Sequence, residues 1–141
     1  MPGFELFGRE EKKEVQDVLD TGVLFRYGFD HARKNRWKAR TFEEELADRL
    51  DVGHCHLCSS GTAALSVALA SCGVGAGDEV IVPPFTFIAT IEVISLLRLK
   101  RVLVDIDPQT FNLDPNSIEK AITEKTKAIV PVHLFGQAAQ M

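Results

Sequence analysis

The sequence of 141 residues contains no apolar run near the length that a helix needs to cross a bilayer, although 45% of its residues are apolar. Its start, MPGFELFGREEKKEV, also lacks the basic region and apolar stretch that mark a secretory signal. Both absences argue against a membrane protein and against export. We therefore expect one soluble globular unit in the cytoplasm.

Cysteine is scarce, since the chain has only Cys55, Cys58 and Cys72. An odd count in a chain expected to be intracellular argues against a disulfide framework, so we expect reduced thiols. Two of these cysteines lie in HCHLC beside His54 and His56, and imidazole and thiolate are the usual ligands of zinc. Because alternate residues of a strand point to opposite faces, these side chains converge only if the chain turns. We therefore expect no metal site.

A large excess of charge is also missing, because the formal net charge is only -4. The basic stretch HARKNRWKAR, residues 31–40, is followed almost at once by acidic residues 43–45. This pattern gives no electrostatic footprint for nucleic acid, and we expect neither a nucleic-acid nor a membrane partner. The basic stretch could contact phosphates, but a solvated loop or turn is the favoured interpretation.

What the sequence does contain is a regular alternation of helix and strand patterns. The predicted helices span 9–20, 41–53, 62–74, 87–99 and 114–123; the predicted strands span 54–58, EVIVPPF as far as its prolines, 100–107 and 127–136. VLFRYGFD, which follows the first helix, is too short and too interrupted for either, and we expect an ordered loop there.

End signals support two of these helices. Thr41 is the expected cap of the second helix, Glu44 completes a capping box three residues later, and Gly53 is its expected stop. Asp114 is the expected cap of the last helix, with Pro115 at the first helical position.

Strands that alternate with helices predict an α/β fold with a mostly parallel sheet and helices on both faces. Ligands of such sheets bind at the carboxyl ends of the strands. The candidate ligand positions are therefore the loops 58–62, 83–87, 105–108 and 132–136.

SSGTAAL lies at one of these junctions, where a short strand is expected to give way to a helix. Free amides and the positive end of the helix dipole favour a phosphate there. Gly61 would permit a tight turn and a close approach, and Thr62 would add a hydroxyl donor. Close packing explains small residues equally well, and the pattern is neither a Walker loop nor the GxGxxG fingerprint. Spacing alone leaves both interpretations open.

PPFTFIAT supplies the next strand end, with Phe85 and Phe87 two residues apart. In extended backbone these rings lie on the same side, where one could stack on a planar ligand. Taken alone, ordinary core aromatics are the favoured interpretation, since buried phenylalanine is common.

Four ordered segments, SSGTAALSVAL, GDEVIVPPFTFIAT, VLVDIDPQTFNLDP and TKAIVPVHLFGQAAQM, together resemble the N-terminal part of sugar aminotransferases of the DegT/DnrJ/StrS type, which depend on pyridoxal 5'-phosphate. The likeness runs from about residue 3 to the last residue. It implies the first part of the large domain of a type I aminotransferase fold over 41–141, preceded by an N-terminal helix and substrate-side loop over 1–40.

The resemblance also implies roles for individual residues. The turn of Gly61, Thr62 and Ala63 would hold the cofactor phosphate, and Phe87 would lie against the pyridine ring. The substrate-side loop would present three adjacent residues to the substrate, namely Phe25, Arg26 and Tyr27.

Members of this family transfer an amino group, usually from glutamate, to a keto group on a nucleotide-linked sugar or related cyclitol, by a ping-pong exchange on the cofactor. The resemblance therefore implies a role in nucleotide-sugar and polysaccharide biosynthesis. It also implies a homodimer with active sites at the subunit interface.

The chain departs from the family pattern in RLKRVLVDID, which lacks the usual Gly-Ala turn, and in the final AQM. The family's acidic partner of the pyridine nitrogen and its Schiff-base lysine lie beyond the last motif, and neither Lys100 nor Lys127 is a credible substitute. We therefore expect no catalytic residue in this chain, which would be about the first third of such an enzyme and inactive alone. The alternative hypothesis is a non-catalytic remnant or interaction fragment. A zinc-binding module is a third and weaker hypothesis.

Overall fold

The computed structural model describes residues 3–141. These residues divide into two compact units that meet in the sequence between Leu57 and Cys58. No helix within the described residues is long and apolar enough to span a membrane. The expected division at residue 40 concerns the function of the two parts and stays a prediction.

The N-terminal unit is helical. It contains η1 (Phe4–Leu6), α1 (Arg9–Leu19) and α2 (Lys38–Leu50). The helix predicted over 9–20 is confirmed as α1, and it begins where the Glu11 carboxylate accepts a hydrogen bond of 2.6 Å from the Gly8 amide. That bond satisfies one of the free amide groups that every helix start leaves.

The predicted start of α2 at Thr41 is wrong, because the helix already begins at Lys38. Thr41 lies inside the first turn, where its amide donates to the Trp37 carbonyl at 2.8 Å. The capping box was therefore misplaced. Trp37 precedes the helix and is held by the guanidinium groups of Arg33 and Arg40, whose central carbons lie 4.0 and 3.8 Å from the ring centroid. Such cation–π contacts leave no signal in a capping pattern.

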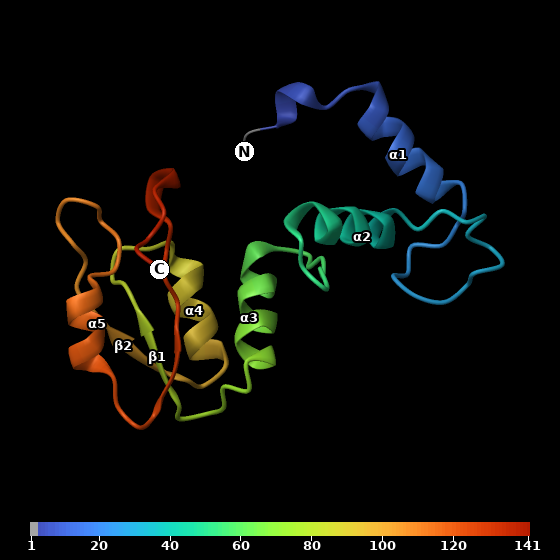
Figure 1. Ribbon diagram of the computed structural model, residues 1–141. Coiled ribbons are helices and arrows are strands. Elements are labelled where there is room, and N and C mark those ends of the chain that lie inside the picture. The colour runs from blue at the N-terminus through green and yellow to red at the C-terminus, as the bar shows by residue number, and fades with distance from the viewer. Residues whose placement is uncertain (1–2) are drawn as a thin grey trace. The chain divides into compact units, whose positions relative to one another are not determined.

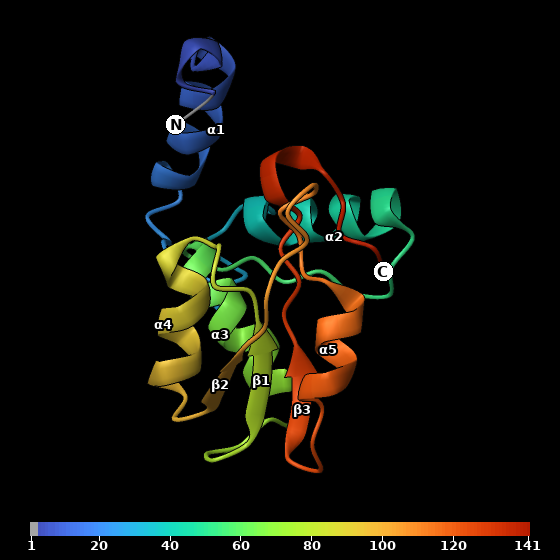
Figure 2. The same cartoon turned by 90° about the vertical axis from the view of Figure 1, so that its left-hand side faces the viewer.

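The C-terminal unit alternates strands and helices. It contains α3 (Gly61–Ser71), β1 (Glu79–Val82), α4 (Ile88–Leu96), β2 (Lys100–Leu103), α5 (Pro115–Ala121), β3 (Thr126–Ile129) and η2 (Leu134–Gly136). The three strands are parallel, in the order β2-β1-β3, with β1 in the middle (Figure 2). This confirms the predicted α/β fold with a parallel sheet.

Helices cover both faces of this sheet, with α3 and α4 on one side and α5 on the other (Figure 1). The alternation within β1 explains this arrangement. Val80 and Val82 pack with residues of α3 and α4, whereas Ile81 packs with Leu113 and the α5 side. All three β1 side chains are fully buried, which is typical of a central parallel strand.

The strand predicted over 54–58 does not form. The Leu57 amide donates to the Glu43 carboxylate at 2.6 Å, and the Leu57 carbonyl accepts from Arg26 at 3.4 Å. Side chains therefore take the backbone groups that a sheet partner would need.

The strands predicted over 100–107 and 127–136 form, but each ends after four residues. Pro131 lacks the amide that would continue β3. After β2 the chain folds back on itself, and Ile106 pairs with Leu113 in an isolated antiparallel bridge.

The predicted cap of α5 is confirmed. The Asp114 carboxylate accepts from the Asn116 amide at 3.1 Å, and Pro115 occupies the first helical position. The Ser117 hydroxyl also donates to this carboxylate. That hydrogen bond is the largest cause, and the one from the Asn116 amide the second, of a pKa of Asp114 below its usual range.

Candidate functional site

Three loops follow the parallel strands at their carboxyl ends, and buried Asn112 joins two of them. Its side-chain oxygen accepts a hydrogen bond of 3.2 Å from the Leu134 amide, and its side-chain nitrogen donates to the Ala138 carbonyl at 3.3 Å. The loop after β2 is thereby fixed to the loop after β3. No sequence pattern indicates this role, because an isolated asparagine in a loop is usually a turn residue.

Phe85 extends this connection to the loop after β1. Its ring centroid lies 5.9 Å from that of Phe111 and 6.4 Å from that of Phe135. Phe111 and Phe135 both have left-handed backbones, with φ values of 60° and 51°. Bulky residues rarely adopt that conformation, and such outliers cluster at functional sites. The three strand ends therefore share one aromatic cluster.

Phe87 does not take part in that cluster. It precedes α4 with extended backbone, its side chain is 75% exposed, and it forms no aromatic pair with any residue between 3 and 141. Phe85 and Phe87 thus differ in surroundings, although the sequence placed them on one side. Phe87 is the more exposed of the two residues, at 75% against 45% for Phe85.

The turn into α3 leaves hydrogen-bond donors free. Ser60 caps the helix, since its hydroxyl accepts from the Ala63 amide at 3.1 Å and its carbonyl accepts from the Ala64 amide at 2.9 Å. The Gly61 and Thr62 amides, and the Thr62 hydroxyl, have no acceptor in the part of the chain that the structure describes. Three donors at one helix start are therefore unused, whereas the Ala63 amide is already in use.

Gly61 differs from the expectation in one respect. Its φ lies outside the left-handed region, so the turn does not require glycine. A β-carbon added there would meet nothing within 4 Å, which leaves open space above the free amides. The first turn of α3 also carries no acidic residue. The positive end of the helix dipole is thus uncompensated, and this arrangement fits a phosphate.

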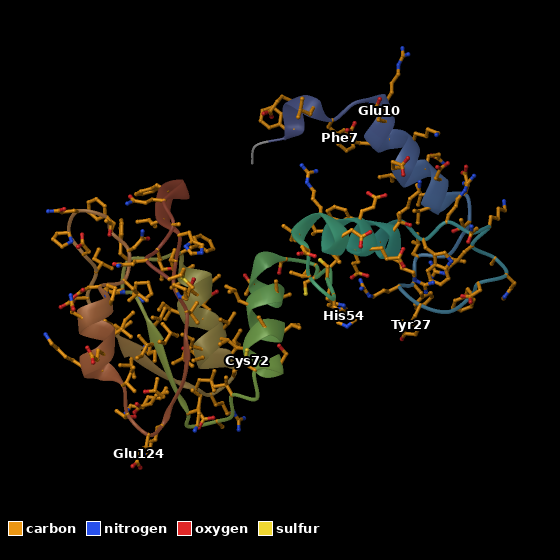
Figure 3. The ribbon with its side chains drawn as sticks, viewed as in Figure 1. Phe7, Glu10, Tyr27, His54, Cys72 and Glu124 are labelled. Atoms are coloured by element: carbon orange, nitrogen blue, oxygen red, sulfur yellow. The ribbon has the colours of Figure 1, made fainter. Side chains whose placement is uncertain are left out.

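The expected substrate-side loop lies in the N-terminal unit. Phe25 stacks on Phe29 at 5.6 Å between ring centroids. Tyr27 is 77% exposed and points away from its loop (Figure 3). Arg26 forms an ion pair with Glu43, which lowers the pKa of that carboxyl together with the hydrogen bond from the Leu57 amide. The loop is therefore fixed through Arg26, and its aromatic side chains stay available.

The cysteines and histidines of HCHLC do not assemble into a metal site. Within residues 3–141, no group of three or more histidine, cysteine, aspartate or glutamate side chains is placed to hold a metal ion. Cys55, Cys58 and Cys72 are free thiols.

Two curated relatives are similar to most of this chain. The UDP-2-acetamido-2-deoxy-3-oxo-D-glucuronate aminotransferase of Pseudomonas aeruginosa is 43% identical over 133 residues, which cover 93% of this chain and 36% of the relative. The L-glutamine:2-deoxy-scyllo-inosose aminotransferase of Micromonospora echinospora is 49% identical over 102 residues, which cover 72% of this chain and 24% of the relative. The chain therefore spans about a third or less of these relatives.

Solved structures show the same likeness. 3-Amino-5-hydroxybenzoic acid synthase superposes with a TM-score of 0.82 at 38% identity, covering 94% of this chain and 33% of that one. NtdA from Bacillus subtilis, with its cofactor PMP bound, has a TM-score of 0.72 at 38% identity, covering 90% of this chain and 29% of that one. The predicted first part of an aminotransferase large domain is confirmed. A family model also matches residues 6–141, and the chain belongs to the DegT/DnrJ/EryC1/StrS aminotransferase family.

Proposed function

We propose that these 141 residues are the cofactor-phosphate side of a longer enzyme that transfers an amino group to a keto sugar or keto cyclitol. The observation that carries this proposal is the α3 turn, whose Gly61 and Thr62 donors are unused at an open helix start. Family membership over residues 6–141 supports the reaction class.

The residues present fit pyridoxal 5'-phosphate. Thr62 and the neighbouring amides would bind the phosphate, and Phe87 would lie against the pyridine ring. Bound there, the cofactor supplies an electron sink that allows an amino group to pass from a donor to a keto acceptor. The chain's own contribution is to hold and orient that group, while Asn112 and Phe85 keep the three strand-end loops in a fixed arrangement.

The amino donor and acceptor are drawn from the family. Glutamate is the proposed donor, although the name of the Micromonospora relative specifies L-glutamine for that enzyme. A nucleotide-linked keto sugar is the proposed acceptor, as the name of the Pseudomonas relative suggests, with a keto cyclitol second. A cytoplasmic homodimer is the proposed assembly.

Binding without catalysis is the second candidate, and the positions of the lysines favour it for the 141 residues alone. Lys100 is engaged by Glu79 at the amino ends of the strands, opposite the candidate site, and Lys127 lies within β3. No lysine occurs in the loops 58–62, 83–87, 104–112 or 130–137. A lysine amine is needed to move the proton during transamination.

Isotope transfer tests the proposal. The longer protein, loaded with pyridoxal phosphate, is given ¹⁵N-glutamate or amide-labelled ¹⁵N-glutamine together with a UDP-linked 3-keto sugar or a keto cyclitol. We expect mass spectrometry to find ¹⁵N in an aminated product with one of these pairs. Bound cofactor without label transfer in any pair would contradict the proposal and favour the binding role.

A further inference from the structure

The N-terminal unit contains a cationic cavity that is separate from the candidate cofactor residues. Its volume is about 300 Å³, and its lining includes Trp37 and five cationic side chains but no carboxylate. The five cations are Arg26, Arg33, Arg36, Lys38 and Arg40. All of these residues belong to one compact unit, so the cavity is complete within it.

Three of the five cations are neutralised nearby. Arg26 pairs with Glu43, and both Arg36 and Lys38 pair with Asp17, each at 3.4 Å. The remaining two cations, Arg33 and Arg40, have no carboxylate partner among residues 3–141. These are the two guanidinium groups that stack on Trp37. The uncompensated positive charge of the cavity is therefore concentrated around this indole ring.

Arg33 is held rigidly in place. It is 5% exposed, and it donates to the Gly28 carbonyl at 2.7 Å and to the carbonyls of Phe25 and Tyr27. Residues 31–35 form the expected turn, and Arg33 is the one buried residue of the basic stretch, whose remaining residues are exposed or partly exposed. These bonds use Nε and Nη2, whereas Nη1 has no acceptor in the described chain. Arg40 forms no side-chain hydrogen bond with any described residue. Both guanidinium groups therefore keep free N–H donors.

Two cations without a carboxylate partner beside one ring repel each other, and a bound anion would relieve that repulsion. Guanidinium groups match the geometry of phosphate oxygens, and stacking on an indole leaves their in-plane N–H groups available. The start of α2 also borders the cavity, and Trp37 provides no side-chain cap for it. Its free amides add to the positive potential.

We propose that this cavity binds the diphosphate of a small molecule such as a nucleotide. Where that molecule is the nucleotide-linked acceptor, the inference rests on the proposed function, because the diphosphate would then belong to the substrate. Phe25 and Arg26 line the cavity and also belong to the expected substrate-side loop, so an occupant would contact both.

The longer protein is titrated by calorimetry with uridine diphosphate, inorganic pyrophosphate, uridine and sulfate at constant ionic strength. We expect a saturable change with the two diphosphates, none with uridine, and affinity for sulfate that is at least about tenfold weaker.

Arg40→Gln should weaken diphosphate binding by about tenfold or more, because it removes one charge-assisted contact, and Arg40→Lys should restore part of the loss. Arg49→Gln, the same change on the exposed end of α2, is the matched control and should bind like the parent chain. The inference is wrong if sulfate binds as well as diphosphate, if no phosphate binds, or if both glutamine variants behave alike. This assay needs no turnover, so its failure is distinct from failure of amino transfer.

Discussion

The carboxylate of Glu79 lies 2.8 Å from the ammonium group of Lys100, across the ladder that joins β1 to β2. It also accepts a hydrogen bond of 2.6 Å from the Thr123 hydroxyl, in the turn before β3. One side chain therefore links all three strands at their amino ends. Both contacts lower the pKa of Glu79 from its ordinary value of 4.5, and the contact with Lys100 has the larger effect.

The lowered pKa of Glu79 predicts how stability depends on pH. A carboxyl whose pKa is lower in the folded state stabilises the fold above its unfolded pKa, and that contribution is lost as the pH falls through the folded value. Glu79→Gln should therefore lower the urea midpoint at about pH 7, and the difference from the parent should shrink at about pH 3. Glu124→Gln, at an exposed turn position (Figure 3), is the control and should change little at either pH. Equal midpoints for Glu79→Gln and the parent at neutral pH would contradict this account.

The centre of the sheet should be more sensitive than its edge. Ile81 on β1 is fully buried against the α5 side of the sheet, so Ile81→Ala should cost about 2–5 kcal/mol of unfolding free energy. Leu103 on β2 is 55% exposed, and Leu103→Ala should cost about 1 kcal/mol or less. Urea unfolding followed by circular dichroism gives both values. Similar losses at the two positions would mean that the core is placed elsewhere.

Sequence patterns predicted the elements whose signals are local. The buried run of β1, and the Asp114 and Pro115 start of α5, follow from side-chain type and spacing alone. Elements that depend on distant partners were misjudged. α2 begins at Lys38, directly after Trp37, which stacks on Arg33 and Arg40. No strand forms over 54–58, because Glu43 and Arg26 bind the backbone of Leu57.

The candidate site shows the same limit. The helix start at 60–61 follows from a local pattern of small residues, but the strand expected to precede it does not form, and the role of this turn stays a proposal. The sequence could not separate Phe85 from Phe87, because their different surroundings depend on Phe111 and Phe135 in other loops. Asn112 was missed for the same reason, since its partners lie more than twenty positions along the chain.

The edges of the sheet predict association. Among the described residues β2 and β3 are edge strands, and each exposes a large apolar side chain, Leu103 at 55% and Ile129 at 43%. Exposed apolar edges promote pairing with another chain. We expect the 141-residue chain to self-associate or aggregate at micromolar concentration, and Leu103→Lys to reduce this. A clean, stable monomer of the parent chain in sedimentation velocity would contradict the prediction.

The lysines predict that the 141-residue chain performs no transamination. None lies in the candidate loops, and Lys38 and Lys100 are held by carboxylates. After incubation with pyridoxal phosphate and reduction with borohydride, mass spectrometry should find no stoichiometric adduct at a single lysine. The longer protein is the positive control. One defined adduct in the short chain would show that a lysine had been overlooked.

The central claim is that the α3 turn and Phe87 hold the cofactor, and cofactor titration of the longer protein tests it most directly. Thr62→Val removes one charge-assisted hydrogen bond to the phosphate and should weaken affinity by about ten- to a hundredfold. Phe87→Ala should also weaken affinity, through the loss of ring stacking. Thr41→Val, at an exposed position of α2, should leave affinity unchanged.

The measurement is the change in absorbance of pyridoxal phosphate as each variant is added, with circular dichroism to confirm that the fold is kept. We predict weaker binding for Thr62→Val and for Phe87→Ala, and parental binding for Thr41→Val. Parental affinity in both Thr62→Val and Phe87→Ala would contradict the account, because the small residues at 60–64 would then serve only to pack the sheet.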